Sequence, residues 1–197
     1  MTNQFDLLID SYLENNIGID ADFLTEALSQ GLQQNIRQLQ SDNLMHAAGI
    51  GNKEIKDANQ KMRGDTIYWM DKSHDNTFEQ EFLHQVDNFV DRLNSTCYTG
   101  INSYEFHYAV YEEGSFYKRH KDQFKTDSDR KFSLINYLNN DWLETDGGQL
   151  LVYQNEGVQK IQPQSQKAVF FKSDEMEHEV SLSYRTRMSI TGWLKRV

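Results

Sequence analysis

The chain has 197 residues and a mass of 23.1 kDa, which is enough for one domain with a substantial buried core. Its formal net charge of −10 argues against nucleic-acid binding, because phosphate contacts need clustered Lys and Arg. A mean hydropathy of −0.76, without an apolar run of about 18 residues, argues against a membrane span. The single cysteine, Cys97, cannot form an intrachain disulfide, and the acidic N-terminus does not resemble a signal peptide. We therefore expect a cytoplasmic protein.

Helical patterns dominate the first half of the chain. Apolar residues spaced three and four apart predict helices over residues 5–13, 19–39 and 77–94. Asp20 and Asp22 are candidate caps of the second helix. These helices are expected to support the core and to carry no chemistry.

The second half of the chain has the pattern of a β protein. A strand is predicted over residues 64–70, after a polar loop over 41–62. Eight further short runs predict strands at Glu105–Tyr111, Tyr117–Lys121, Lys131–Leu138, Gln149–Tyr153, Gly157–Ile161, Ala168–Phe171, Glu179–Leu182 and Arg187–Leu194. This order predicts an α+β fold with a double-stranded β-helix, or jelly-roll, core behind supporting N-terminal helices. We expect a single domain over 1–197, with helical support over about 1–95 and the β-barrel over about 104–197.

A candidate metal site begins in the segment Y-E-E-G-S-F-Y-K-R-H-K-D at 111–122. In an extended strand, His120 and Asp122 point to the same face and offer two adjacent ligands. One further His would complete a two-histidine, one-carboxylate set, which leaves positions open on non-haem Fe(II). However, six His and 30 acidic residues give roughly one such triplet by chance, so the triplet alone favours an ordinary solvated pair.

The C-terminal segment changes this balance. It supplies His178 and, nine residues later, Arg187, at the start of an alternating run through Ser189, Thr191 and Trp193. A third ligand followed by a fixed cation suits a metal that also holds a dicarboxylate, because the guanidinium can bind its far end. The other histidines are interpreted as packed or solvated: His46, His74, His84 and His107.

Together these segments resemble the Fe(II)/2-oxoglutarate-dependent dioxygenases. Within them, the chain is similar to the prolyl 4-hydroxylase group, in the branch of the oxygen-sensing prolyl hydroxylases and their bacterial relatives. The matching segments, in the family's order, are R-G-D-x-x-x-W at 63–69, Y-x-x-G-S-F-Y-x-x-H-x-D at 111–122, I-N-Y-L-N at 135–139, D-G-G-Q-L at 146–150, V-F-F-K-S-D at 169–174, H-E-V at 178–180 and T-R-M-S-I-T-G-W at 186–193. The resemblance extends from about Gly49 to the end of the chain.

The resemblance implies a complete set of site residues. Fe(II) would be held by His120, Asp122 and His178, with 2-oxoglutarate chelating the iron. The far carboxylate of 2-oxoglutarate would pair with Arg187 and the Tyr137 hydroxyl. Further residues implied by the resemblance are Tyr111 and Thr191 around the cosubstrate and Trp193, Tyr117, Arg63, Asp65 and Arg130 on the substrate side. Dioxygen is the second cosubstrate, and ascorbate completes the expected cofactors.

The resemblance also makes the loop over 41–62 a lid, tied to the barrel by an ion pair between Asp65 and Arg130. The implied reaction is trans-4-hydroxylation of a prolyl residue in a protein, with 2-oxoglutarate converted to succinate and CO2. A ribosomal protein or translation factor is the expected partner. A carboxylate at position 122 leaves no room for a halide, so halogenation is not expected.

Two alternatives remain open at this stage. One keeps the oxygenase chemistry but uses a small molecule, such as a free amino acid. The R-G-D-x-x-x-W segment and the long loop favour a peptide substrate over a small molecule. The other is a non-catalytic, cupin-like metal-binding module, against which Arg187 and Tyr137 argue because a bare metal site needs no dicarboxylate clamp.

Overall fold

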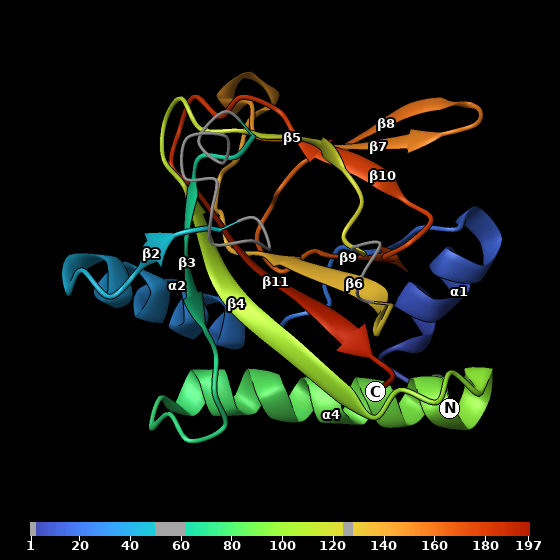
Figure 1. Cartoon of the computed structure of the whole chain (residues 1–197). Coiled ribbons are helices and arrows are strands. Elements are labelled where there is room, and N and C mark those ends of the chain that lie inside the picture. The colour runs from blue at the N-terminus through green and yellow to red at the C-terminus, as the bar shows by residue number, and fades with distance from the viewer. Residues whose placement is uncertain (1–2, 50–61, 124–127) are drawn as a thin grey trace.

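The structure is a computed structural model that describes residues 3–49, 62–123 and 128–197 (Figure 1). Most of the predicted lid, residues 50–61, lies outside these ranges. The helices are α1 (Asp6–Asn15), α2 (Glu26–Ser41) and α4 (Thr77–Cys97), with one 3-10 turn, η1 (Glu144–Asp146). The strands are β1 (Gly18–Asp20), β2 (His46–Ala47), β3 (Asp65–Trp69), β4 (Ser103–Tyr111), β5 (Tyr117–His120), β6 (Arg130–Tyr137), β7 (Leu150–Gln154), β8 (Gly157–Ile161), β9 (Ala168–Lys172), β10 (Glu177–Val180) and β11 (Arg187–Lys195).

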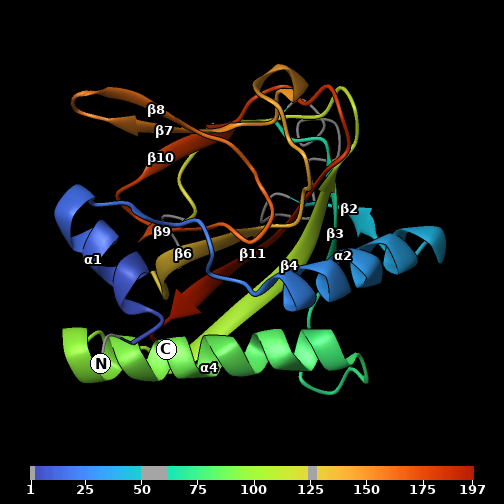
Figure 2. The same cartoon turned by 180° about the vertical axis from the view of Figure 1, so that it is seen from behind.

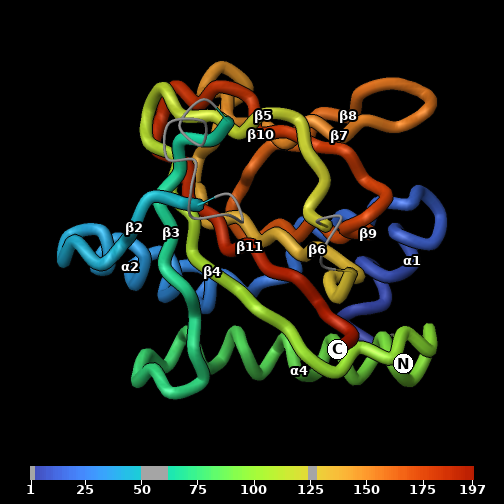
Figure 3. The backbone as a smooth tube through the Cα atoms, in the orientation of Figure 1, coloured from blue at the N-terminus to red at the C-terminus, as the bar shows by residue number. Residues whose placement is uncertain are grey.

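Two antiparallel sheets form the barrel. The larger has the strand order β1-β9-β6-β11-β4-β3-β2, and the smaller has the order β5-β10-β7-β8. The backbone trace in Figure 3 shows the small sheet lying across from β4, β6, β9 and β11, with the chain passing between the two sheets. This arrangement confirms the predicted α+β fold with a double-stranded β-helix core. All eight strands predicted after residue 104 are present, each with ends within two residues of the expected ones.

Helix α4 supports the large sheet from outside. Its stripe of Phe82, Val86 and Phe89 is fully buried, and Asn76 caps its start by accepting a hydrogen bond from the Glu79 N–H at 3.0 Å. The helix ends before Tyr98, which adopts a left-handed backbone with φ of 54°. Figure 2 shows α2 and α4 on the side of the large sheet away from the small sheet, and α1 beside β9.

The two faces of strand β4 pack into two different cores. Phe106, Tyr108 and Val110 belong to the core shared with the helices, whereas Ala109 and Tyr111 belong to the core inside the barrel. This alternation follows from the two-residue period of a strand. One face of the large sheet therefore holds the helices, and the other face is available for a site.

The predicted helix over 19–39 is wrong at its start. Residues Gly18–Asp20 form β1 and pair with β9 at the edge of the large sheet. Helix α2 begins only after Thr25, whose Oγ1 accepts a hydrogen bond from the Leu28 N–H at 3.2 Å. Asp20 and Asp22 therefore do not cap this helix. Ile19 pairs with Val169 of β9, and apolar periodicity cannot show such a long-range contact. Among the described residues, no helix is both long enough and apolar enough to cross a membrane.

Candidate metal and cosubstrate site

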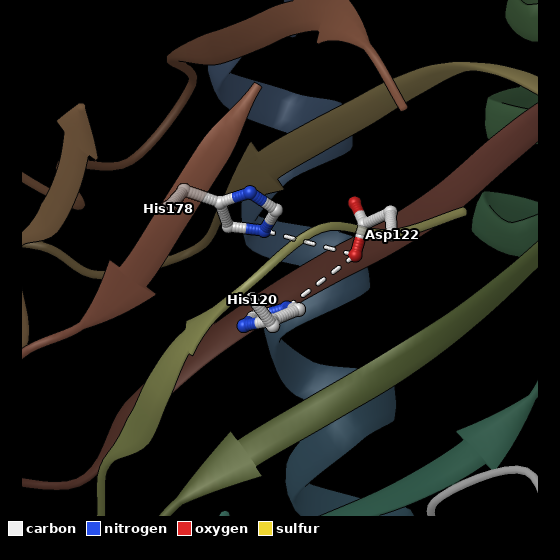
Figure 4. A group of neighbouring side chains, drawn as sticks. All are labelled: His120, Asp122 and His178. Carbon is white, nitrogen blue, oxygen red and sulfur yellow. Dashed lines mark ion pairs between the residues drawn. The ribbon is translucent and has the colours of Figure 1, made fainter. Parts of the chain in front are cut away.

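Three side chains meet at one end of the barrel interior. His120, Asp122 and His178 each offer one ligand atom, and these atoms all lie within 4.8 Å of one another (Figure 4). Asp122 Oδ1 is 3.5 Å from His120 Nε2 and 3.7 Å from His178 Nε2. Two imidazoles and one carboxylate at this separation fit one face of a divalent metal such as Fe(II), with the remaining positions open.

Strand pairing brings the two histidines together. Strands β5 and β10 are antiparallel neighbours, and His178 lies directly opposite His120. Each imidazole lies with Nδ1 against a backbone carbonyl, at 2.7 Å from Lys118 O and 3.2 Å from Met176 O. A proton on Nδ1 donated to these carbonyls leaves the Nε2 lone pair of each ring directed at the metal position.

Asp122 reaches the same point by another route. Strand β5 ends at His120, so Asp122 is not held by strand pairing as the sequence pattern suggested. Instead, its Oδ2 accepts a hydrogen bond from Ser133 Oγ at 2.6 Å. Burial opposes ionisation of this carboxyl, but His178, His120 and Ser133 together hold its pKa well below the usual range. Burial also lowers the pKa of His178. The site thus presents a carboxylate beside a neutral imidazole at neutral pH, which are the protonation states that bind a divalent metal.

The inner wall of the site carries an uncompensated positive charge. Arg187 is only 1% exposed, and its guanidinium donates to Gly148 O at 2.9 Å and Ser189 Oγ at 3.3 Å. Among the described residues, no carboxylate lies within ion-pair distance of it. A buried charge of this kind is costly unless an anion joins it. A carboxylate of a bound ligand would supply that anion.

Two tyrosines flank this guanidinium. Its Cζ atom lies 4.9 Å from the ring centre of Tyr111 and 5.1 Å from that of Tyr137. The Tyr137 hydroxyl is buried and has no hydrogen-bond partner in the described part of the chain. Burial raises the pKa of Tyr137 to about 12, so the hydroxyl stays protonated and can donate to an incoming carboxylate. These contacts support the predicted clamp for the far carboxylate of 2-oxoglutarate.

A cavity of about 240 Å³ connects Arg187 with the three metal-ligand candidates, whereas Tyr137 is not among the residues that line it. His120, Asp122, His178 and Arg187 all line it. The other predicted site residues on its wall are Arg63, Tyr111, Tyr117, Arg130, Thr191 and Trp193.

Comparison with known proteins agrees with this geometry. A family model of the 2OG-Fe(II) oxygenase superfamily matches residues 106–195, which include His120, Asp122, His178 and Arg187. A crystal structure of a Pseudomonas putida prolyl-4-hydroxylase superposes with a TM-score of 0.88 and 29% identity, covering 98% of this chain and 99% of that one. Together these matches support a 2OG-Fe(II) oxygenase.

Two further relatives are prolyl hydroxylases and support this group within the superfamily. A prolyl hydroxylase from Trichoplax adhaerens, solved in complex with a hypoxia inducible factor peptide fragment, has a TM-score of 0.86 and 27% identity, covering 97% of this chain and 88% of that one. Prolyl hydroxylase EGLN3 of Mus musculus is 28% identical over 194 residues, which span 92% of this chain and 76% of the relative. The superfamily uses Fe(II), 2-oxoglutarate and O2, and the donor set and the buried Arg187 of this oxygenase fit them.

The predicted ion pair between Asp65 and Arg130 is wrong. Asp65 is bound by Arg63, whose Nε and Nη2 lie 2.6 and 2.5 Å from its two oxygens. Arg130 donates instead to Glu105 at 2.7 and 3.0 Å and lies 3.5 Å above the ring of Trp193. Glu105 and Trp193 are direct cross-strand neighbours on β4 and β11, so one guanidinium can lie over both. Asp65 is not on the cavity wall.

His107 is a cavity residue that the sequence analysis did not assign. It lies on β4 between Trp69 and Trp193, with ring-centre distances of 4.9 and 5.4 Å. Its Nδ1 and the Trp193 Nε1 are both buried without a hydrogen-bond partner among the described residues. Burial, aided by the charge of Arg63, lowers the pKa of His107 to about 3. Its strand position could have indicated a place in the cavity, because residues 107, 109 and 111 share one face of β4.

The remaining histidines lie away from the site. His46 and His84 are exposed, and His74 pairs with Glu79 at 2.7 Å. None of the three contributes to the metal-ligand group found among the described residues.

The depressed pKa of His107 predicts an acid-sensitive stability. In the unfolded chain this group titrates near 6.5, so between pH 6.5 and 3 the unfolded state binds up to one more proton than the folded state. The free energy of unfolding contributed by His107 is therefore present above pH 6.5 and declines as the pH falls, by about 2 kcal/mol at pH 5. Urea denaturation of metal-free wild type and His107→Leu at pH 7.5 and pH 5 measures this. The variant should lose less stability between the two pH values, and an equal loss in both proteins would contradict the assignment.

Proposed function

We propose that this oxygenase hydroxylates a prolyl residue within a polypeptide, at the trans-4 position, while 2-oxoglutarate becomes succinate and CO2. The observation that carries the proposal is the buried Arg187, which lacks a carboxylate partner among the described residues and shares one cavity with His120, Asp122 and His178. A simple metal-binding module would have no use for that charge. The solved relative with a bound peptide fragment supports a polypeptide substrate.

The residues of the site would have distinct roles. His120, Asp122 and His178 would hold Fe(II) through one face, and the iron supplies the oxidising chemistry when bound. Arg187 and the protonated Tyr137 would hold the far carboxylate of 2-oxoglutarate and so fix its orientation relative to the metal. The apolar barrel interior excludes bulk water around these groups.

Aromatic rings form the outer part of the cavity, where the substrate would enter. Tyr117 stacks on His120 with ring centres 3.6 Å apart and planes 17° apart, so its ring lies directly beside the metal position. Trp69 is 47% exposed at the same cavity, and Trp193 lies 6.3 Å from it. Flat aromatic faces suit the apolar pyrrolidine ring of a prolyl residue.

Several finer proposals accompany this function. We propose that residues 1–197 form one domain, because the helices and the large sheet share one core. The single cysteine supports a reducing, cytoplasmic location. We also propose ascorbate as the reductant of the iron, and a ribosomal protein or translation factor as the substrate. Both proposals rest on the family resemblance alone. The role of the loop over 41–62 as a lid rests on the same resemblance.

The test has two stages. Anaerobic Fe(II) and 2-oxoglutarate should give a weak visible metal-to-ligand charge-transfer band. In air, proline-containing peptides from a defined library should stimulate succinate release and gain one oxygen atom at a proline by mass spectrometry. Stimulation by free proline but by no peptide would instead support a small-molecule oxygenase. Bound metal without the band or succinate would overturn the oxygenase assignment and favour a metal-binding module.

A further inference from the structure

Asp122 is held in place by a pair of buried serine hydroxyls. Ser133 Oγ lies 2.6 Å from Asp122 Oδ2 and 2.9 Å from Ser173 Oγ. Both serines are 0% exposed. They come from different parts of the large sheet, since Ser133 is in β6 and Ser173 directly follows β9.

The direction of these hydrogen bonds is fixed by proton counting. Ser133 Oγ donates its single hydroxyl proton to Oδ2 of Asp122. Ser173 must then donate its own proton to Ser133. The result is a one-way chain from Ser173 through Ser133 to Asp122, in which the last hydrogen bond is charge-assisted.

The backbone holds this chain rigidly. Ser173 N–H donates to Lys131 O at 3.0 Å, and Gln123 N–H donates to Ser173 O at 3.1 Å. Arg130 Nη1 donates to the Asp122 carbonyl at 3.3 Å. These bonds fasten Asp122 to β6 and β9, although its own strand has already ended.

We propose that Ser133 is a positioning residue that makes Asp122 a one-oxygen metal ligand, with Ser173 orienting the Ser133 hydroxyl. The hydroxyl occupies Oδ2, so only Oδ1 is presented to the metal, and Oδ1 is the atom nearest both His120 Nε2 and His178 Nε2. A carboxylate can bind a metal through one oxygen or two. Binding through both would take a position that 2-oxoglutarate or O2 needs. This inference rests on the proposed function and deepens it.

Ser133→Ala tests the proposal in the full-length protein. The variant frees Oδ2, so we expect the charge-transfer band to change in wavelength and the 2-oxoglutarate concentration at half-saturation of the band to rise about tenfold or more. Fe(II) affinity should fall by about 10–100-fold, as when other groups that hydrogen-bond a metal ligand are removed. Ser133→Thr keeps the hydroxyl and should restore the wild-type band. Ser173→Ala should have a smaller effect, because Ser133 keeps its own proton.

A matched control separates positioning from general packing. Ser29 Oγ and Ser165 Oγ form another hydroxyl pair at 2.7 Å that lies outside the cavity wall, so Ser165→Ala should leave the band unchanged. If Ser133→Ala does not fold, Ser133→Cys offers a weaker donor of similar size and should show a smaller shift in the same direction. The positioning role alone would be overturned if the folded Ser133 variant kept the wild-type band at the same wavelength and with the same 2-oxoglutarate half-saturation. Absence of the band in the wild type would overturn the proposed function itself.

Discussion

Alanine in place of His178 is expected to abolish Fe(II) binding and to lower turnover by more than about 100-fold. Groups that merely support a metal ligand already cost about 10–100-fold when removed, so loss of a ligand must cost more. His178 lies opposite His120 on the neighbouring strand, and the variant leaves Asp122 with one imidazole. The charge-transfer band and succinate release would both measure the loss.

Thermal unfolding gives an independent readout of the same change. A metal that binds only the folded state raises Tm with concentration, so Fe(II) under anaerobic conditions should stabilise the wild type but not the variant. His84→Ala is the matched control, because His84 is exposed on α4 and outside the metal-ligand group. A His178 variant whose Tm rises with Fe(II) at the wild-type concentrations would show that the metal lies elsewhere.

The strands could be predicted from the sequence, but their partners could not. Alternation and turn residues located β4 to β11 closely, since the two-residue period is a local property. The short strand β1 escaped notice because Gly18–Asp20 is extended only through its pairing with β9. The contact between His120 and His178 likewise depends on the pairing of β5 with β10, which no local pattern specifies. For that contact, the family resemblance supplied what periodicity could not.

Contacts between side chains were even harder to predict from the sequence than strand pairing. The ion pair expected for Arg130 failed because the sequence does not show that Glu105 and Trp193 lie side by side. Ser133 and Ser173 were not predicted as site residues, since a serine in a strand or just after one has many ordinary explanations. Their role depends on Asp122 lying beyond the end of β5, where two hydroxyls replace strand pairing.

Replacing Arg187 by alanine is expected to weaken 2-oxoglutarate binding by about tenfold or more while Fe(II) binding persists. A charge-assisted hydrogen bond to a carboxylate contributes about 1.5–3 kcal/mol, and Arg187 is not one of the three candidate metal ligands. Titrating the charge-transfer band with 2-oxoglutarate at saturating Fe(II) measures the change. The 2-oxoglutarate affinity of Arg187→Lys should lie between those of the wild type and Arg187→Ala, because an ammonium keeps the charge but loses the planar guanidinium fork. Tyr137→Phe should cost less, about 0.5–1.5 kcal/mol, because it removes only a neutral donor.

The pattern across these variants distinguishes a clamp from a structural arginine. If Arg187 were present only for packing, its loss would lower the free energy of unfolding equally with and without 2-oxoglutarate. In the clamp, the buried guanidinium lacks a carboxylate partner among the described residues until the ligand arrives, so the stabilisation by 2-oxoglutarate should shrink in Arg187→Ala and remain intact in a control such as Arg37→Ala on α2. Equal stabilisation of Arg187→Ala and wild type would show that the dicarboxylate binds elsewhere. The buried charge would then need another anion, and the cavity another ligand.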